Sequence, residues 1–520
     1  MKAQELLIPL SVKNKVAGWG RRLSSQPQLP TLRGFGLGFV ALLLVIFGMT
    51  RVRAELWLDA LLLVVPGLLL WLWQFRQGSH AQRPLTVLSQ LRWPRWWLGG
   101  LLSLGSLGMG LWGWRTLDVA HPSVGDWQWY LASIGLLLVA AAVMEEWRRP
   151  QVTGWKSSGW VLLGIVALGA VVRLAALGSL PFGTWYDEAA NGLEALRILR
   201  EPDYQPIYTD GVNATGHYLW LIVGAFKLFG ETTVALRGIS AVMGIATVVA
   251  AYLAGRELHG QRLGLVWALL FAVARWSITF SRLGMYNSAT PLFELLALFW
   301  LLRGLRRGSV LDFTLAGVAV GLGLCFYSAF QLFLVVLAVF GLVVAWQERA
   351  HWRTIWVGAA ISAVAALLVI APLVKYVRAK PESYFARVQA TSLFSDKAPE
   401  ERIPALWENT RKHLLMFNVR GDPNGRHNLS GEPMLDWVTG GLMVVGLVTC
   451  LWMGAAPRYL LVPVWIGVGL LGGILSLDFE APQSLRAIGA MPAVLLCAAL
   501  PIDLLAQQWQ SGGGRYFPSA

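Results

Sequence analysis

The sequence predicts an all-α protein that crosses a membrane many times. Of its 520 residues, 56% are hydrophobic and only 14% are charged, whereas soluble domains carry about 25% charged residues. The mean hydropathy is +0.55. Apolar runs of about 20 residues, the length of helix that crosses ~30 Å of hydrocarbon, recur along most of the chain. The runs are continuous rather than alternating, which excludes a transmembrane β-barrel.

Length and hydropathy predict about fourteen membrane-spanning helices. Two polar stretches, residues 179–236 and 375–433, interrupt the series of apolar runs. Within the first stretch, the apolar segment 215–229 is too short for an ordinary span, so we expect an interfacial or re-entrant helix there. The predicted spans cover residues 33–49, 55–75, 96–114, 127–145, 158–178, 237–255, 262–279, 288–305, 312–326, 328–346, 353–374, 434–453, 458–475 and 486–507.

The spans and the polar stretches divide the chain into five parts. A basic N-terminal segment, which shows no cleavable signal peptide, precedes an appended bundle of four spans. The core comes next, and we expect the catalytic residues in its first outside loop, residues 179–236. An outside loop region and the C-terminal spans complete the chain. These five parts cover residues 1–32, 33–150, 151–374, 375–433 and 434–520, respectively.

Positive charge gives the expected orientation, because cytoplasmic loops of membrane proteins are enriched in Lys and Arg. The net charge of +14 arises largely in short loops between spans, so it does not indicate nucleic-acid binding. We expect a cell-membrane protein with both termini in the cytoplasm and both long polar stretches outside. Arg51 and Arg53, in a short outside turn, are the exception. The basic loops that this orientation places inside are 76–95, 146–157, 256–262, 303–311 and 347–353.

Two adjacent carboxylates, Asp187 and Glu188, follow the span that ends near Gly178. A carboxylate pair at the mouth of a membrane helix favours chemistry on a substrate that itself lies in the membrane. The residues after the pair show an amphipathic pattern, which predicts a helix along the membrane surface. The alternative interpretation is that Asp187 only caps this helix, because the positive end of the helix dipole favours an acid.

Four arginines lie at or near the outside ends of predicted spans. Arginine beside hydrocarbon is costly and is usually paired or functional, although a single one could simply extend its head group to the interface. Four of them on the face that carries the acids predict an anionic ligand, since guanidinium groups match phosphate well. These candidate phosphate-binding residues are Arg173, Arg237, Arg282 and Arg486.

The second polar stretch contains GDPNGRHNLSGEP, residues 421–433, whose Gly, Pro and Asn content predicts a loop. Arg426 and His427 are its candidate ligands for a sugar or a phosphate, and an ordered loop without a ligand is the alternative. Further polar candidates are Asp422 and Asn428 in this loop, and Tyr327 and Gln331 at another outside turn.

A divalent cation at Asp187, Glu188 and His427 is a further alternative. The outside turn SRLGMYNSATP, however, contains arginine and no acid, so we expect no metal and no other cofactor. The three cysteines, Cys325, Cys450 and Cys497, lie within apolar spans at spacings that fit no metal site or disulfide framework.

Several of these segments together resemble the GT-C membrane glycosyltransferases that use polyprenyl-phosphate sugars. They are the Asp-Glu pair, the segment GHYLWLIVGAFKLFG, and the run from ALRGISAVMG to FSRLGMYN. The nearest types in appearance are the protein O-mannosyltransferases (glycosyltransferase family 39-like) and the lipid A aminoarabinose transferases. The resemblance covers roughly residues 158–345, continues loosely to 507, and implies the GT-C fold.

The resemblance also implies roles for individual residues. Asp187 would be the catalytic base or would orient the acceptor, Glu188 would be its partner acid, and Arg237 would approach the pair. His217 stands where the mannosyltransferases begin this segment with His-Pro-Pro. Here the segment reads His217-Tyr218-Leu219, so the match there is partial.

These observations predict an envelope glycosyltransferase. It would move a sugar from a polyprenyl-phosphate donor to a hydroxyl of a lipid, glycan or protein acceptor on the outer face of the membrane. Asp187 would take the hydroxyl proton in an inverting displacement, and arginines would stabilise the leaving phosphate. Membrane lipids would surround the protein, and no nucleic acid would bind it.

The main alternative is a transporter or flippase for a lipid-linked anionic substrate. It would place charges near the bilayer midplane, whereas the charged residues here lie at the ends of the spans. A polymerase or ligase that transfers a longer glycan is the nearest enzyme alternative. A structural subunit would need neither acids nor arginines on one face.

Overall fold

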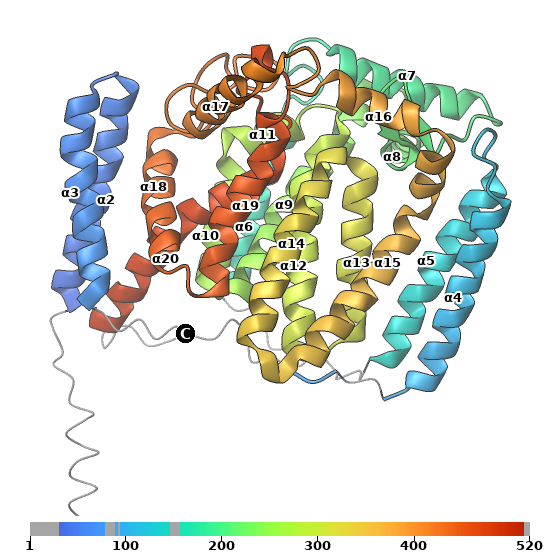
Figure 1. Ribbon diagram of the computed structural model, residues 1–520, viewed down its shortest axis with the longest axis horizontal. Helices are drawn as coiled ribbons and strands as arrows, with labels where there is room; N and C mark the ends of the chain where they lie inside the picture. Colours follow the sequence, from blue (N-terminus) through green and yellow to red (C-terminus); the bar gives the residue numbers. More distant parts are fainter. Residues whose placement is uncertain (1–30, 78–88, 92–93, 146–156, 514–520) are drawn as a thin grey trace, which may run out of the picture.

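The computed structural model describes residues 31–77, 89–91, 94–145 and 157–513 (Figure 1). In these residues almost all regular structure is helical, which confirms the predicted all-α polytopic membrane protein. Nine of the described helices are long and apolar enough to cross a membrane, or ten if one bent pair forms a single span. The predicted number of about fourteen is not confirmed, because several other apolar helices have 17 residues or fewer.

A helix or a bent helix pair lies over each predicted span. These helices are α2 (Thr31–Arg53), α3 (Trp57–Gln77), α4 (Trp96–Thr116), α5 (Val124–Met144), α6 (Ser157–Leu174), α9 (Thr233–Leu258), the pair α10 (Gln261–Val273) and α11 (Arg275–Ser281), α12 (Thr290–Arg307), α13 (Val310–Phe326), α14 (Gln331–Gln347), α15 (Trp352–Ala379), α18 (Trp437–Trp452), α19 (Pro457–Ile474) and α20 (Met491–Gly513). The N-terminal segment 1–32 and the inside loops 76–95 and 146–157 lie largely outside the described residues.

The remaining elements are short and lie between the spans. The helices are α7 (Tyr186–Arg200), α8 (Gly216–Phe229), α16 (Pro381–Ala390) and α17 (Pro399–Leu415). The 3-10 turns are η1 (Tyr286–Ala289), η2 (Ser328–Phe330), η3 (Arg349–His351), η4 (Asp478–Glu480) and η5 (Ile488–Ala490). One antiparallel ladder joins β1 (Tyr208–Thr209) to β2 (Ala214–Thr215), with Tyr208 opposite Thr215.

The core is built around the helices that are most completely buried. In α20 and α12, 89% and 78% of the apolar window is buried inside the protein, compared with 22% in α3. Such all-round burial is expected of a helix that other helices surround. Bulky side chains such as Trp267 of α10 and Trp465 of α19 are completely buried between these helices.

The first four spans do not form the single appended bundle that we expected for residues 33–150. Helices α2 and α3 pack on α18 and α20, whereas α4 and α5 pack on α13 and α15, at the opposite edge of the core (Figure 1). Close packing and hydrogen bonds hold helices together in lipid. Trp71 donates to Thr449 at 2.9 Å, and Tyr130 donates to the Val369 carbonyl at 2.7 Å. Each hairpin therefore has its own attachment to the core.

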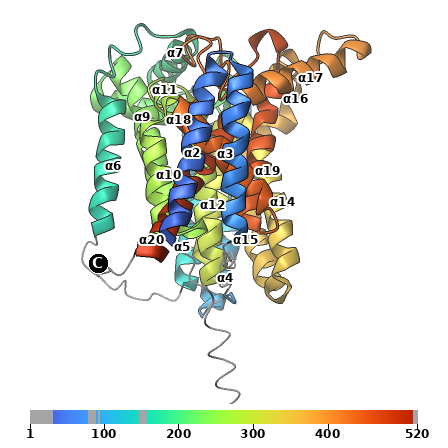
Figure 2. The same cartoon turned by 90° about the vertical axis from the view of Figure 1, so that its left-hand side faces the viewer.

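The short helices α7, α8, α16 and α17 gather at one end of the spans (Figure 1), and Figure 2 shows α16 and α17 reaching past the spans there. The basic turns 256–262, 303–311 and 347–353 lie at the other end, since α13, α14 and α15 connect the two ends. Arg53, the exception to the charge pattern, donates to the Leu435 carbonyl. Segment 215–229 forms α8 beside α7, and whether it enters the membrane stays a prediction.

Candidate active site

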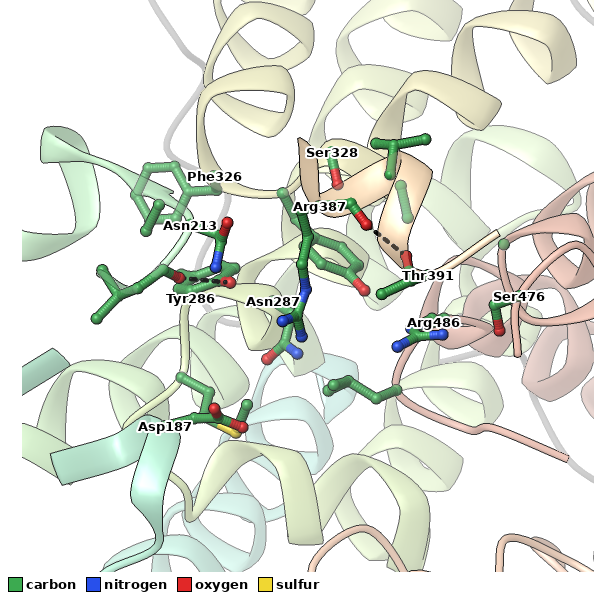
Figure 3. A pocket seen from close by; sticks show the side chains of 18 of the residues that line it. Asp187, Asn213, Tyr286, Asn287, Phe326, Ser328, Arg387, Thr391, Ser476 and Arg486 are labelled. Atoms are coloured by element: carbon green, nitrogen blue, oxygen red, sulfur yellow. Dashed lines mark hydrogen bonds between the residues drawn. The ribbon is translucent and has the colours of Figure 1, made fainter. Parts of the chain in front are cut away.

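A cavity of about 680 Å³ lies at the end of the spans, and residues of both α7 and α16 line it. Its lining combines the Asp187 carboxylate with three guanidinium groups, those of Arg387, Arg426 and Arg486. Figure 3 shows Asp187, Arg387 and Arg486 around this space, together with Asn287 of η1. Aliphatic side chains from several spans also line it, namely Leu324, Leu332, Leu373 and Leu471, together with Leu485 of the turn before η5. The cavity can therefore accept a ligand that has an anionic part and an apolar part.

Asp187 and Arg426, which are far apart in the sequence, form an ion pair at this cavity. Asp187 lies in the first turn of α7 with its side chain 39% exposed, and the Arg426 side chain is 19% exposed. Nη1 of Arg426 donates to Oδ2 of Asp187, while Nε of Arg426 donates to Nε2 of His427 at 3.0 Å. The candidate acid and the candidate loop are thus parts of one site.

Glu188 forms a different pair, fully inside the protein. The side chains of Glu188 and Arg237 are both 0% exposed, and two hydrogen bonds of 2.7 and 3.0 Å join them. The backbone N–H groups of Gly284 and Trp185 also donate to the carboxylate. The remaining N–H donors of Arg237 reach the carbonyls of Leu177, Pro181 and Gly183.

Neither member of this buried pair lines the cavity. The resemblance correctly brings Arg237 to the acid pair, but Arg237 contacts Glu188 and not Asp187. Glu188 also accepts the hydrogen bond from Trp185, the residue that precedes α7, so Glu188 rather than Asp187 closes the start of the helix. This geometry favours a structural clamp, and a direct catalytic role for Glu188 stays a prediction.

Two of the four arginines that we expected to bind phosphate instead donate to backbone carbonyls, one at a helix bend and one at a helix end. Helices α10 and α11 meet at a 60° bend, which leaves backbone carbonyls without helical partners. Every N–H donor of Arg173 is used at this bend, on Phe271, Ala272, Ser277, Ser281 and, within its own helix, Gly169. Arg282 donates to carbonyls at the end of α6 and just past it, those of Val172, Arg173, Ala175 and Leu180. Neither arginine lines the cavity.

His217 joins the core to the α4–α5 hairpin. Its Nε2 lies 3.0 Å from the Tyr130 hydroxyl, and its Nδ1 lies 3.2 Å from the Thr215 hydroxyl. Since Tyr130 belongs to α5, this contact connects α8 to the hairpin that we expected to be an appendage. His217 is not among the residues that line the cavity, so binding of substrate by His217 stays a prediction.

The loop 421–433 is held by Asp422 and His427, whose side chains are both 0% exposed. Oδ2 of Asp422 accepts hydrogen bonds from His427 Nδ1 at 3.1 Å, from the Ser484 N–H at 2.8 Å and from the Ser484 hydroxyl at 2.7 Å. Burial raises the pKa of Asp422, but the bonds from His427 and Ser484 outweigh burial and hold that pKa below its usual value. Asn428 donates to the Asp422 and Glu432 carbonyls and so also holds the loop.

The guanidinium groups of Arg486 and Arg387 retain free binding capacity. Arg486 lies 3.1 Å from Glu480, and its Nη1 has no hydrogen-bond partner among the described residues. Arg387, on α16, is not among the residues predicted from the sequence. Region 375–433 contains several basic residues, and no sequence pattern distinguishes Arg387 from the others. Figure 3 places Arg387 between Asp187 and Arg486. Tyr327 and Gln331, the weaker candidates, do line the cavity.

The three residues considered for a cation have separate partners. Asp187 pairs with Arg426, Glu188 with Arg237, and His427 with Asp422. Among the described residues, no group of three or more His, Cys, Asp or Glu side chains could hold a metal ion. Metal dependence stays open to a direct test. All three cysteines are buried within the protein.

Comparison with known proteins gives the same class as the sequence segments. Residues 217–376 match the family model described as dolichyl-phosphate-mannose-protein mannosyltransferase. Two relatives, from Pseudomonas paraeruginosa and Pseudomonas aeruginosa, are undecaprenyl phosphate-alpha-4-amino-4-deoxy-L-arabinose arabinosyl transferases. Each is 32% identical over 174 residues, which cover 32% of this chain and 31% of the relative. The matched part of the chain thus spans about a third of the length of these curated relatives.

Solved structures show weaker similarity. ArnT from Cupriavidus metallidurans bound to undecaprenyl phosphate is 18% identical with a TM-score of 0.45, over 69% of this chain and 62% of that one. The Archaeoglobus fulgidus oligosaccharyltransferase in complex with Zn and sulfate is 16% identical with a TM-score of 0.46, over 68% and 50%. The family-model match and the curated relatives confirm the predicted resemblance to the GT-C glycosyltransferases that use polyprenyl-phosphate sugars.

Proposed function

We propose that this protein is a membrane glycosyltransferase that moves a sugar from a polyprenyl-phosphate donor to an acceptor hydroxyl. The observation that carries the proposal is the cavity at the end of the spans, in which Asp187 meets Arg387, Arg426 and Arg486. A carboxylate can accept a proton during attack, and guanidinium groups stabilise a phosphate that gains charge. The match of residues 217–376 to a family of sugar transferases supports the same class.

The lining of the cavity supports a lipid-linked donor. Arg387 makes no side-chain hydrogen bond among the described residues, and Nη1 of Arg486 has no partner there either, so both are suited to bind the donor phosphate. The aliphatic lining side chains, such as Leu332 of α14 and Leu471 of α19, would contact the first isoprene units. The remainder of the tail would continue between spans, where the membrane is its solvent.

Asp187 would act as the general base. The acceptor hydroxyl loses its proton to Asp187 while its oxygen attacks the anomeric carbon of the donor sugar. The bond from that carbon to the phosphate oxygen breaks, and both its electrons leave with the polyprenyl phosphate. Arg387 and Arg486 would stabilise the charge that develops on this leaving group. Direct displacement inverts the anomeric centre.

The arrangement of the spans supports an active site on the outer face. The cavity and the basic turns 256–262, 303–311 and 347–353 lie at opposite ends of the spans. Because basic turns are enriched on the cytoplasmic side, the cavity would open outward. Both termini would then be cytoplasmic, and the acceptor would be a lipid, a glycan or a protein of the cell envelope.

The test is sugar transfer by protein reconstituted in liposomes, with a panel of polyprenyl-phosphate sugars and release of polyprenyl phosphate as the readout. Asp187→Asn should lower turnover about 10²–10⁴-fold, the usual contribution of a general base. Asp203→Asn removes an exposed acid of the same outside loop and is the matched control. A wild-type protein that consumes no donor, or an equally active Asp187→Asn protein, would contradict the proposal. Movement of the lipid-linked substrate across the bilayer without transfer would favour the transporter.

The same assay decides the metal question. We expect a chelator such as EDTA to leave the rate unchanged, because the polar partners of the site are guanidinium groups rather than a cluster of acids. Loss of activity with EDTA, and recovery with an added divalent cation, would instead assign a cation to the site.

A further inference from the structure

A continuous series of contacts leads from the cavity into the buried part of the protein. Asp187 accepts from Arg426, Arg426 donates to His427, and His427 contacts Asp422. Because Nε2 of His427 accepts the Arg426 Nε–H, the ring proton lies on Nδ1 and is donated to Asp422. Phe280 packs beside the same ring, with 5.6 Å between the ring centroids. The imidazole therefore has one defined orientation.

A second branch leaves the same carboxylate oxygen of Asp422. The backbone N–H and the hydroxyl of Ser484 both donate to it. Two residues further on, the Arg486 N–H donates to the Gln483 side chain at 2.7 Å, and the Gln483 N–H donates to buried His413 at 3.1 Å. The segment that carries Arg486 is thus fastened at successive points, one of which is Asp422.

The loop 421–433 has other bonds that close it. The Gly421 N–H donates to the Gly431 carbonyl, the Gly431 N–H donates to the Asp422 carbonyl, and Ser430 donates to the Pro423 carbonyl. The Asp422 carboxylate contributes to this closure through Oδ1, which accepts the Asn424 N–H at 2.8 Å, whereas Oδ2 has no partner within the loop other than His427. A buried carboxylate is costly unless it is fully paired. The partners of Asp422 Oδ2 are His427, which contacts Arg426, and Ser484, which lies two residues before Arg486.

We propose that Asp422 is a positioning residue for both of these arginines. Through His427 it orients Arg426 against Asp187, and through Ser484 it holds the segment that presents Arg486 to the cavity. Asp422 and His427 do not line the cavity, so they act only through the arginines. This inference rests on the proposed function, in which Asp187 is the base and Arg486 binds the donor phosphate.

The two branches predict different kinetic effects in the reconstituted enzyme. His427→Ala should lower kcat about 10- to 100-fold, the usual weight of a hydrogen bond to a charged group, with the donor KM little changed. His427→Gln should recover most of kcat, because its amide can accept from Arg426 and donate to Asp422. Ser484→Ala should raise the donor KM with kcat nearly unchanged, and Asp422→Ala should change both.

Asp436→Asn is the matched control. Asp436 is also a carboxylate at this end of the protein. Among the described residues, its side chain accepts hydrogen bonds from Val438 and Thr439 at the start of α18, and it does not line the cavity. Neither kcat nor KM should change in this variant. If Asp422→Ala does not fold, the His427 and Ser484 variants still decide the matter.

Three results would each overturn one of the two proposals, and a fourth would support both. If His427→Ala and His427→Gln lose activity to the same extent, and the yield of folded protein falls in parallel, the proposal is overturned. His427 would then have a role in loop structure alone. Unchanged kcat in His427→Ala would also overturn the proposal. Full activity of Asp187→Asn in the same series would instead overturn the proposed function. An inactive Asp187→Asn together with the predicted split between kcat and KM supports both.

Discussion

Two neighbouring carboxylates of α7 meet two arginines in opposite ways. Glu188 and Arg237 are both 0% exposed, and each carboxylate oxygen of Glu188 accepts two N–H groups. Asp187 is 39% exposed and pairs with Arg426 at the edge of the cavity. The first pair is closed to any ligand, whereas the second faces the space that a ligand would occupy.

The difference teaches that adjacency in sequence does not imply a shared role. Consecutive side chains of an α-helix point about 100° apart, so one acid can face α9 while the next faces the cavity. The closed pair fastens the start of α7 to α9 and to the turn at Gly284. It thereby fixes the helix that carries the open pair. If this comparison holds, changes in the two pairs should affect different properties.

The largest expected effect is on catalysis, at the open pair. Asp187→Asn should lower the transfer rate about 10²–10⁴-fold while the free energy of unfolding changes by no more than about 0.5 kcal/mol, as is usual for a partly exposed side chain. Transfer assays and unfolding in detergent on the same preparation measure both properties. A clear loss of stability in this variant would contradict the comparison, because Asp187 would then stabilise the fold as Glu188 does.

Apolar length was sufficient to predict which segments form the long apolar helices and that α7 lies beyond the end of one of them, because it reflects the thickness of the bilayer directly. Sequence patterns could not distinguish the roles of Asp187 and Glu188, because the partner of each lies far away in the chain. Arg426 is 239 residues from Asp187, and Arg237 is 49 residues from Glu188. Burial on α7 shows the same limit. Its buried face contains Glu188 and Asn191, whereas Leu193 is 66% exposed.

The arginines show a further limit of prediction. Arg173 and Arg282 have the same sequence signature as Arg486, since each stands near an end of a predicted span. Their hydrogen-bond partners are carbonyls of helix ends, which become available only when α10 bends and α6 finishes. No sequence pattern pointed to Arg387, because its place at the site depends on the position of α16 beside the cavity.

The second largest effect should be on stability, at the closed pair. Glu188→Ala would leave the Arg237 guanidinium buried without its counter-charge, which typically costs about 3–5 kcal/mol. We expect reduced yield and a lower unfolding midpoint in detergent. Changing both residues together, to Glu188→Leu and Arg237→Leu, should recover part of the loss, since no buried charge then remains. A stable but inactive Glu188→Ala protein would show instead that Glu188 takes part in the chemistry.

A smaller effect should separate a cavity arginine from a helix-capping one. Arg387→Ala should raise the donor KM about 10-fold, the lower end expected for a lost hydrogen bond to a charged group, without changing stability. Arg282→Ala should lower the unfolding midpoint and leave the donor KM unchanged, because its donors reach carbonyls at the end of α6 and just past it. Steady-state kinetics and unfolding curves on both variants give the comparison. Equal effects on KM would place Arg282 in the binding site as well.

The smallest effect concerns the pH dependence of stability through Asp422. Its pKa is lower in the folded protein than usual, because the hydrogen bonds from His427 and Ser484 outweigh burial. The unfolded state therefore binds a proton more readily, and the stability that Asp422 provides is fully present above the unfolded pKa of about 3.9. This stability is lost as the pH falls through the folded pKa. The difference in unfolding midpoint between wild type and Asp422→Asn should thus be constant from about pH 7 to 5 and should shrink below about pH 4. A difference that shrinks already between pH 7 and 5 would mean that the Asp422 carboxylate is not the group that titrates.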